Sequence, residues 1–406
     1  MTTARAMNTH ETTQADALRE AMVSELRELG AIRSDRVAAA VGTVPRHLFA
    51  PGEPLETVYA PTRAIVTKRN EHGAALSSLS ESHIQATMLE QAQLEPGMRV
   101  LEIGTGGYNA ALIAELVGES GTVTSVDIDP DIVDRARDCL AAAGYDQVNV
   151  VLADAEDGVP GHAPYDRVIV TAGAWDIPPA WSDQLADDGR IVVPLRMRGL
   201  TRSVTFERDG NHLVSRDYRL CGFVPMQGVG AYTENRVSLD GEEVGLRVDG
   251  EQPVDADRLR QALFAPRVER WSGVVFAQPD ELELWLGTAT PVPGLLTAKD
   301  GPIERGLVAP SAIRGVPTVV SGGSFAYRTK RPIPGTDEFE LGVYAHGPDA
   351  EAVAEEYVDL LRTWDRDHRG GPQARIEVYP AATPAAELPQ GRVIDKKHTR
   401  VVISWP

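Results

Sequence analysis

Carboxylates and glycines follow one another at the ends of apolar segments in the middle of this 406-residue chain. Residues 102–107 read Glu-Ile-Gly-Thr-Gly-Gly, Asp127 ends the next apolar segment, and Asp154 ends the third. A strand that enters a helix through glycines lets the backbone approach a ligand and directs the helix amides toward it. Asp127 lies 23 residues after Gly104, where a carboxylate can accept hydrogen bonds from both hydroxyls of a ribose. The pattern predicts a nucleotide-sized pocket at the carboxyl ends of these strands.

Simpler interpretations exist for each of these features. Glycines also serve tight turns, and an aspartate after a strand can be a solvated loop residue. The combination of the glycine loop with Asp127 and Asp154 favours the binding interpretation, because all three lie where open α/β sheets bind ligands.

The segments around these residues alternate between strand-like and helical patterns. Near-continuous apolar runs separated by helices predict a parallel sheet covered on both faces, hence an α/β fold. The expected strands are 98–103, 121–128, 148–154, 165–173 and 190–195, and the expected helices are 109–118, 129–144 and 179–189. Asp209-Gly210 between alternating runs predicts an antiparallel hairpin over 203–218.

Helices are expected before this region. Leu18, Met22, Leu26 and Leu29 recur at helical spacing, Ser34 has the character of a helix cap, and 80–94 is periodic again. We therefore assign 1–95 to an N-terminal helical segment that covers the active site, and 96–240 to the nucleotide-binding domain.

The periodicity changes near residue 235 and predicts a second domain of α+β type over 245–406. One helix is expected over 349–368, with apolar residues on one face. The expected short strands are 281–287, 317–323, 339–346, 374–380 and 399–405.

The amino-acid composition limits the kinds of molecule that this protein is expected to bind. The net charge of -19 disfavours nucleic acid and anionic membrane surfaces as partners. No apolar run approaches the length of a membrane span, so a soluble, cytoplasmic protein is expected. Cys139 and Cys221 are the only cysteines, and the histidines lack ligand-like spacing, so we predict no metal site.

The loop at 102–107, with an acidic residue on the first strand, resembles the first motif of class I (Rossmann-like) methyltransferases. That resemblance implies S-adenosyl-L-methionine as cofactor and S-adenosyl-L-homocysteine as product. It also implies that Glu102 faces the methionine end, that Asp127 holds the ribose, and that Asp154 contacts the adenine amino group.

Further blocks are similar to those of protein-L-isoaspartate O-methyltransferases. They are VPRHLF at 44–49, SESHIQATMLE at 80–90, PGMRVLEIGTG at 96–106, YDRVIVTAG at 165–173 and GRIVVP at 189–194. The resemblance places Ser80 beside the acceptor carboxylate, and we favour this role over the alternative that the serine caps the following helix. The residues assigned to the cofactor are Glu102, Gly104, Thr105, Gly106, Asp127, Ile128, Asp154 and Ala155, and the catalytic residue is Ser80.

The chain also departs from that family. Its glycine loop is one residue shorter, Ser82-His83 replaces a proline-containing pair, and the chain continues well beyond the methyltransferase region. With the blocks at 171–185, 193–203, 220–228 and 395–405, it resembles the lanthipeptide-associated (FxLD-system) methyltransferases of gene clusters for ribosomally made peptides. That resemblance implies a modified precursor peptide as substrate, with an aspartate that is esterified and then converted to aspartimide and isoaspartate.

A carboxylate acceptor fits the motifs. It is already ionised near neutral pH, so no strong base is needed, and a hydroxyl such as Ser80 can orient one of its oxygens. The two open alternatives are a repair enzyme acting on isoaspartate, and a binding protein that keeps the cofactor fold without turnover. His83, Trp175 and Trp181 are left out of the site, because each can equally be structural.

Overall fold

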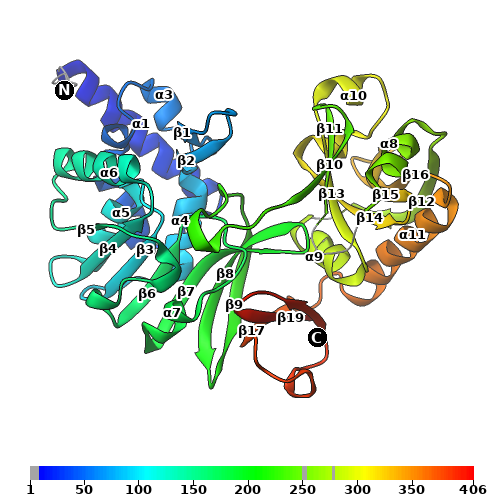
Figure 1. The fold of residues 1–406 in the computed structure, drawn as a ribbon. Coiled ribbons are helices and arrows are strands. Elements are labelled where there is room, and N and C mark those ends of the chain that lie inside the picture. Colours follow the sequence, from blue (N-terminus) through cyan, green and yellow to red (C-terminus); the bar gives the residue numbers. More distant parts are fainter. Residues whose placement is uncertain (1–8, 249–253, 277–278) are drawn as a thin grey trace.

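The computed structural model describes residues 9–248, 254–276 and 279–406, which form two lobes (Figure 1). In the described part of the first lobe, a mixed sheet has the order β18-β19-β17-β9-β8-β7-β6-β3-β4-β5. Pairing is parallel from β7 through β6, β3 and β4 to β5, and antiparallel elsewhere. The strands are β3 (Arg99–Ile103), β4 (Thr122–Asp127), β5 (Asn149–Leu152), β6 (Tyr165–Val170), β7 (Leu185–Met197), β8 (Leu200–Asp209), β9 (His212–Leu220), β17 (Arg375–Pro380), β18 (Arg392–Asp395) and β19 (Thr399–Ser404).

Helices cover both faces of the parallel part, as the sequence pattern predicts. Successive strand residues point to opposite sides, so Val100 joins the core beneath the N-terminal helices while Leu101 joins the core on the other face. The helices are α1 (Thr9–Glu28), α2 (Asp35–Thr43), α3 (Leu55–Val58), α4 (Ser82–Ala92), α5 (Tyr108–Val117), α6 (Pro130–Ala143) and α7 (Pro179–Asp183), and a separate hairpin is formed by β1 (Ile65–Arg69) and β2 (Ala75–Leu79).

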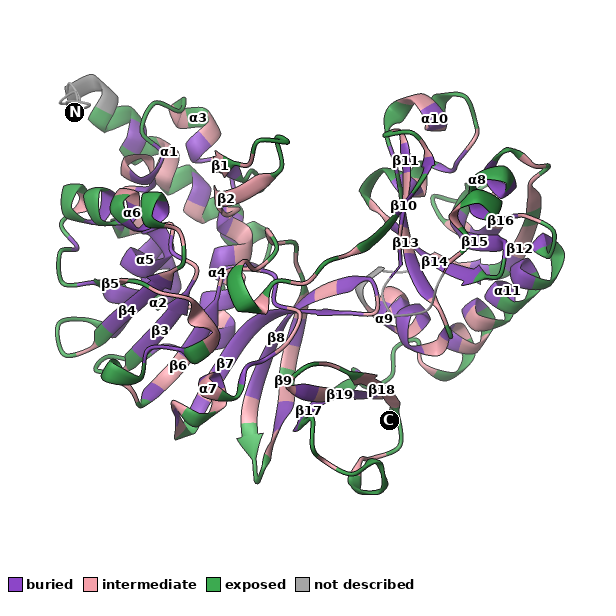
Figure 2. Ribbon diagram, viewed as in Figure 1, coloured by how far each residue is buried: buried purple, intermediate pink, exposed green. Residues whose placement is uncertain are grey.

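The second lobe is built on an antiparallel sheet of order β10-β11-β13-β14-β15-β16-β12. Its strands are β10 (Asn235–Asp240), β11 (Val244–Val248), β12 (Val268–Val275), β13 (Pro293–Ala298), β14 (Val316–Ser321), β15 (Ser324–Pro332) and β16 (Phe339–His346). Its helices are α8 (Ala256–Phe264), α9 (Pro279–Ala289), α10 (Asp300–Glu304) and α11 (Ala350–Asp367). Buried side chains gather along the strands of both lobes, and exposed residues lie on the outer helices and turns (Figure 2). The expected α/β fold is therefore present, together with an additional, largely antiparallel C-terminal sheet region.

The final strands return to the first lobe, where Glu377 and Val378 of β17 pair with Val214 and Leu213 of β9. In Figure 1 these red strands lie beside the green β9. The expected domain over 245–406 therefore contributes to both sheets, and the second lobe is an insertion between β9 and β17. The sequence pattern predicts these strands, but it does not indicate which strands they pair with.

Two local predictions are wrong. Residues 281–287 belong to helix α9, not to a strand. Leu282 and Leu286 pack in the second lobe and Leu284 in the first, so a helix buried on opposite faces mimics strand alternation. Of the helix expected over 179–189, only Pro179–Asp183 is helical, because Leu185 already pairs with Tyr165 in the sheet.

Several N-terminal and hairpin predictions are confirmed. The Ser34 hydroxyl accepts a hydrogen bond from the Val37 amide at 3.2 Å and caps α2. The hairpin at Asp209-Gly210 joins β8 and β9, with Gly210 at φ +61°. Met22 and Leu26 are buried in α1, whereas Leu29 lies beyond the helix end and is 53% exposed.

None of the described helices is long and apolar enough to cross a membrane.

Candidate active site

The glycine loop connects β3 to α5 and requires glycine for two different reasons. Gly104 has φ +89°, and a Cβ there would lie 2.8 Å from Oγ1 of Thr171. That hydroxyl donates a hydrogen bond to the Gly104 carbonyl at 2.6 Å, which fixes the loop on the end of β6. Gly107 has φ +81° and lies against the Phe49 ring, where a Cβ would approach to 3.0 Å. The loop is therefore held close to the sheet, with the first turn of α5 behind it.

The carboxylates of Asp127 and Asp154 stand at the ends of neighbouring strands. Asp127 accepts hydrogen bonds from the amides of Thr105 at 3.0 Å and Asp129 at 2.9 Å. Asp154 accepts from the amides of Glu156 at 2.9 Å and Val229 at 2.8 Å. These bonds orient both carboxylates at the carboxyl edge of the parallel sheet, where ligands of α/β proteins bind.

Glu102 is fully buried on β3 beneath the glycine loop. Burial raises the pKa of its carboxyl group to about 7, although hydrogen bonds from Ser125 and Asn109 oppose the rise. Burial also raises the pKa of Asp127, whose backbone amide donors oppose that rise. Three carboxyl groups in one partly dry site favour a ligand that carries positive charge and hydrogen-bond donors.

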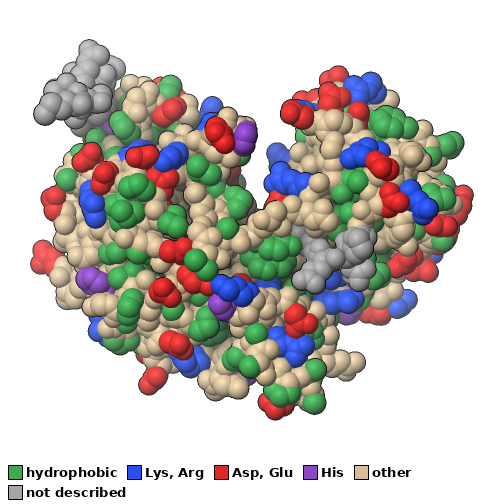
Figure 3. All heavy atoms as spheres, viewed as in Figure 1, with side chains coloured by type: hydrophobic (Ala, Val, Ile, Leu, Met, Phe, Trp, Pro, Cys, Tyr) green, Lys and Arg blue, Asp and Glu red, His purple; other side chains and the backbone are tan. Residues whose placement is uncertain are grey.

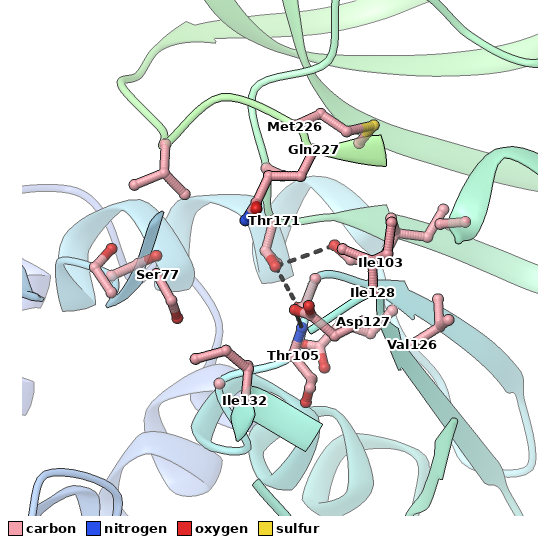
Figure 4. Close-up of a pocket in the computed structure, with 18 of the residues that line it drawn as sticks. Ser77, Ile103, Thr105, Val126, Asp127, Ile128, Ile132, Thr171, Met226 and Gln227 are labelled. Atoms are coloured by element: carbon pink, nitrogen blue, oxygen red, sulfur yellow. Dashed lines mark hydrogen bonds between the residues drawn. The ribbon is translucent and has the colours of Figure 1, made fainter. Parts of the chain in front are cut away.

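All nine residues assigned from the sequence line one pocket, which offers about 870 Å³ of space counting the part open to solvent. Figure 4 shows Thr105 and Ile132 on one side of it and Met226 and Gln227 on the other. The nine are Ser80, Glu102, Gly104, Thr105, Gly106, Asp127, Ile128, Asp154 and Ala155. The structure thus brings together residues from β2, β3, β4 and β5 ends that are distant in the sequence.

Ser80 lies between β2 and α4 and lines the pocket. Helix α4 has Glu81 at its N-cap without a side-chain cap bond, so Ser80 does not cap it. The buried guanidinium of Arg46 donates to the Ser80 carbonyl at 2.6 Å and to Gln85 Oε1 at 2.9 Å. The backbone of Ser80 is therefore held at the pocket through its carbonyl, and that hydrogen bond does not use its hydroxyl.

Sequence reasoning missed the pocket wall formed by Val224, Pro225, Met226 and Gln227. This wall belongs to residues 221–234, which we call the connector because they join β9 to β10 of the second lobe. The connector pairs with the first lobe through the Gly173 amide and the Val224 carbonyl, at 2.8 Å. A distinctive stretch at 220–228 was visible in the sequence, but nothing local to it indicates that it folds over a pocket.

Three residues left open from the sequence are now placed. Trp181 is fully buried and donates to the Ala155 carbonyl at 2.7 Å, which is a structural role. Trp175 stacks on Tyr232 of the connector, with ring centroids 3.7 Å apart. His83 is half-buried and lies 3.2 Å from Glu81, away from the pocket lining.

Sequence comparison identifies the fold with a known enzyme family. The profile described as Protein-L-isoaspartate(D-aspartate) O-methyltransferase (PCMT) matches residues 17–230. The chain belongs to this family. It is an S-adenosylmethionine-dependent carboxyl O-methyltransferase, and the alternative of a binding protein without turnover is set aside.

Curated relatives match about half of the chain. A protein-L-isoaspartate O-methyltransferase of Methanopyrus kandleri is 37% identical over 219 residues, which cover 53% of this chain and 94% of the relative. One of Hyperthermus butylicus is 41% identical over 221 residues, covering 52% of this chain and 88% of the relative. About half of the present methyltransferase therefore has no counterpart in these two proteins.

A solved structure titled protein-L-isoaspartate O-methyltransferase is similar over a longer range. It covers 88% of this chain and 96% of its own, with a TM-score of 0.50 and 24% identity. That range exceeds the profile match and extends into the second lobe. The likeness concerns the fold alone.

The residues of this methyltransferase fit its cofactor. The Thr105 hydroxyl is buried in the pocket without a partner among the described residues, and a Cβ at Gly106 would meet only the Ser78 carbonyl oxygen, at 3.9 Å. Carboxylates stand at the three positions where the family resemblance places the methionine, ribose and adenine contacts.

Proposed function

We propose that this methyltransferase esterifies the side chain of an aspartate in a ribosomally synthesised, modified peptide of lanthipeptide type. The observation that carries the proposal is the connector, which forms one wall of the pocket and leads directly into the second lobe. A lobe attached at that wall is positioned to select the chain that presents the acceptor. The sequence blocks at 171–185, 193–203, 220–228 and 395–405 support the same assignment, and they lie partly outside the matched region.

The residues of the site would act by position and charge. Asp127 and Asp154 would bind the ribose and the adenine amino group, and Glu102 would face the methionine end of S-adenosylmethionine. The cofactor supplies an activated methyl group on a positively charged sulfur. Ser80, with its backbone held by Arg46, would donate a hydrogen bond to one acceptor oxygen while the other oxygen is methylated. The products are a methyl ester and S-adenosyl-L-homocysteine.

The ester changes the peptide without further help from the protein. Methoxide leaves more readily than hydroxide, so the following backbone nitrogen attacks the side-chain carbonyl and closes an aspartimide, with loss of methanol. Hydrolysis of the imide then yields isoaspartate or aspartate.

A second candidate is repair of isoaspartate in damaged proteins. The two curated relatives bear that enzyme's name, and the match covers most of their length. The two candidates differ in their acceptor, since repair acts on isoaspartate in many peptides and tailoring acts on aspartate in one modified peptide.

Mass spectrometry distinguishes them. The purified protein is incubated with S-adenosylmethionine and with two matched peptides, one with aspartate inside a macrocycle and one linear with isoaspartate. A gain of one methyl group followed by loss of methanol on the macrocycle alone supports tailoring. Methylation of the linear isoaspartyl peptide alone overturns it in favour of repair.

A further inference from the structure

The turn between β18 and β19 lies against the first lobe. We call residues 396–399 the C-terminal turn, in which Thr399 already begins β19. The His398 amide donates to Oδ2 of Asp176 at 2.6 Å, and the Thr399 hydroxyl donates to Oδ1 of the same carboxylate. The C-terminal turn is therefore anchored to the loop that follows β6, although it lies outside the region matched by the family profile, which ends at residue 230.

Glu156 is the residue through which the C-terminal turn reaches the cofactor side of the first lobe. Its Oε1 lies 2.8 Å from Nζ of Lys397 and 2.7 Å from Nε2 of His398. The side chains of Glu156 and His398 are only 14% and 22% exposed. Figure 3 shows basic, acidic and histidine side chains close together near the centre of the visible face. Because two groups hold one largely buried oxygen, they fix Glu156 more firmly than an exposed ion pair would.

Glu156 is in turn linked to the carboxylate of Asp154. Its backbone amide donates to Oδ1 of Asp154 at 2.9 Å, at the start of the 3-10 turn η2 (Ala155–Asp157). The other oxygen of Asp154, Oδ2, accepts from the Val229 amide of the connector. The next connector residue, Gly230, lies beside Glu156, since a Cβ there would be 3.7 Å from Oε2 of Glu156. The two hydrogen bonds that orient Asp154 therefore come from segments that adjoin Glu156.

These contacts form a continuous path from the C-terminal turn to the pocket. Lys397 and His398 contact the Glu156 side chain, the Glu156 amide binds Asp154, and Asp154 lines the pocket. Glu156 itself does not line the pocket, so it can influence a bound cofactor only through its neighbours. A hydrogen bond weakens steeply when its distance or angle changes. A displaced Glu156 would therefore leave the Asp154 carboxylate less well oriented.

We propose that Glu156, Lys397 and His398 are positioning residues for the cofactor, which orient Asp154 toward the adenine amino group. The proposal rests on the proposed function, because that function assigns Asp154 to the adenine. It adds a part of the chain outside the family match, since the C-terminal turn completes the adenine end of a pocket that the matched region builds. The affinity for the adenine then depends on whether the final strands are docked on the first lobe.

Calorimetry of the full-length protein with two ligands provides the test. One ligand is S-adenosyl-L-homocysteine, and the other is S-inosyl-L-homocysteine, in which a keto oxygen replaces the adenine amino group. The wild type should bind the inosyl ligand roughly tenfold or more weakly, because an acceptor then faces the Asp154 carboxylate in place of a donor. Glu156→Gln keeps the size of the side chain and removes its charge. It should weaken binding of the adenosyl ligand about three- to tenfold and change binding of the inosyl ligand little, so that the ratio of the two dissociation constants falls.

A double variant, Lys397→Met with His398→Leu, removes the same contact from the other side. It should lower the ratio to the same extent as Glu156→Gln. Adding Glu156→Gln to it should have little further effect, because residues that share one contact are coupled in their effects. A substitution that only loosened the fold would weaken both ligands alike and would leave the ratio unchanged.

Asp157→Asn is the matched control, since Asp157 is the next residue of η2 and is exposed, and it loses the same charge. It contributes its carbonyl, not its side chain, to the hydrogen bond from Gln184, and it should keep the wild-type ratio. A wild-type ratio in Glu156→Gln, or an equal fall in Asp157→Asn, would overturn the proposal. So would equal wild-type affinities for the two ligands, since Asp154 would then not contact the amino group. These measurements need no peptide, so failure of the proposed acceptor is a separate result.

Discussion

The backbone amide of Val229 donates a 2.8 Å hydrogen bond to Oδ2 of Asp154, so a carboxylate assigned to the cofactor also holds the connector to the second lobe. Gly228, immediately before it, has φ +73°, and a Cβ there would lie 2.2 Å from the same oxygen. The connector can approach Asp154 only because this residue is glycine.

We therefore expect Gly228→Ala to displace the connector and to weaken cofactor binding by about tenfold or more. Gly222→Ala is the control, because it lies in the same connector with nothing within 4 Å of its Cβ. Isothermal titration calorimetry with S-adenosyl-L-homocysteine measures both. Equal affinities for the two variants would contradict the role given to this contact.

Asp127→Ala removes the acceptor assigned to the ribose and also the partner of the Thr105 amide. We expect a loss of cofactor affinity of roughly 10- to 100-fold, since a hydrogen bond to a charged group contributes about 1.5–3 kcal/mol. Asp134→Ala on the exposed face of α6 should bind like the wild type. Calorimetry showing unchanged affinity for Asp127→Ala would refute the site assignment.

Ser80→Ala should slow methyl transfer and leave both cofactor affinity and thermal stability unchanged. The reason is that Arg46 holds Ser80 through its backbone carbonyl, so removing the hydroxyl leaves that hydrogen bond in place. We expect kcat to fall by about 10- to 100-fold with an unchanged dissociation constant for the cofactor. A variant with normal kcat would remove Ser80 from the catalytic group.

Glu102 should make the unliganded protein less stable as pH rises. Its carboxyl has an ordinary pKa near 4.5 in an unfolded chain, and burial raises the folded-state pKa to about 7. Between these values the unfolded state is ionised while folded Glu102 stays protonated, so stability is lost as pH rises from about 4.5 to 7. Glu102→Gln should flatten this dependence and stabilise the unliganded protein at pH 8 by on the order of 1–3 kcal/mol, measured by urea unfolding. Equal slopes for both proteins across this window would show that Glu102 is ionised when folded.

Truncation after residue 240 should destabilise the methyltransferase lobe. It removes β17 and β19, whose Ile376, Val378, Val401 and Ile403 belong to the core on one face of the first sheet. It also leaves β9 as an open, aggregation-prone edge. We expect a lower melting temperature and aggregation on gel filtration, and a monodisperse, fully stable fragment would show that these strands are dispensable.

The parallel part of the fold could be predicted from the sequence because each strand and helix there has a pattern that lies within its own residues. Glu102, Asp127 and Asp154 each lie at the carboxyl end of an apolar strand. Parallel strands end at the same edge of a sheet, so the three side chains are expected to lie close together. Ser80 was assigned to the site from the family resemblance and not from a local sequence pattern. In the structure it lines the same pocket as the three carboxylates.

What could not be predicted depends on contacts between distant residues. The α9 leucines show strand-like alternation because two different lobes bury them. Met226 and Gln227 become pocket residues only because the connector pairs with Gly173. The return of β17 to β9 joins residues about 160 positions apart, which no local periodicity encodes.

The pairing of β17 with β9 also determines how late in protein synthesis the first sheet can be completed. Leu220 ends β9 and Arg375 begins β17, so about 155 residues must leave the ribosome before β9 can acquire its neighbour. At roughly 5–20 residues per second this interval lasts about 8–30 s. Throughout this interval β9 is an unpaired edge of the nascent sheet, where pairing with another chain can begin.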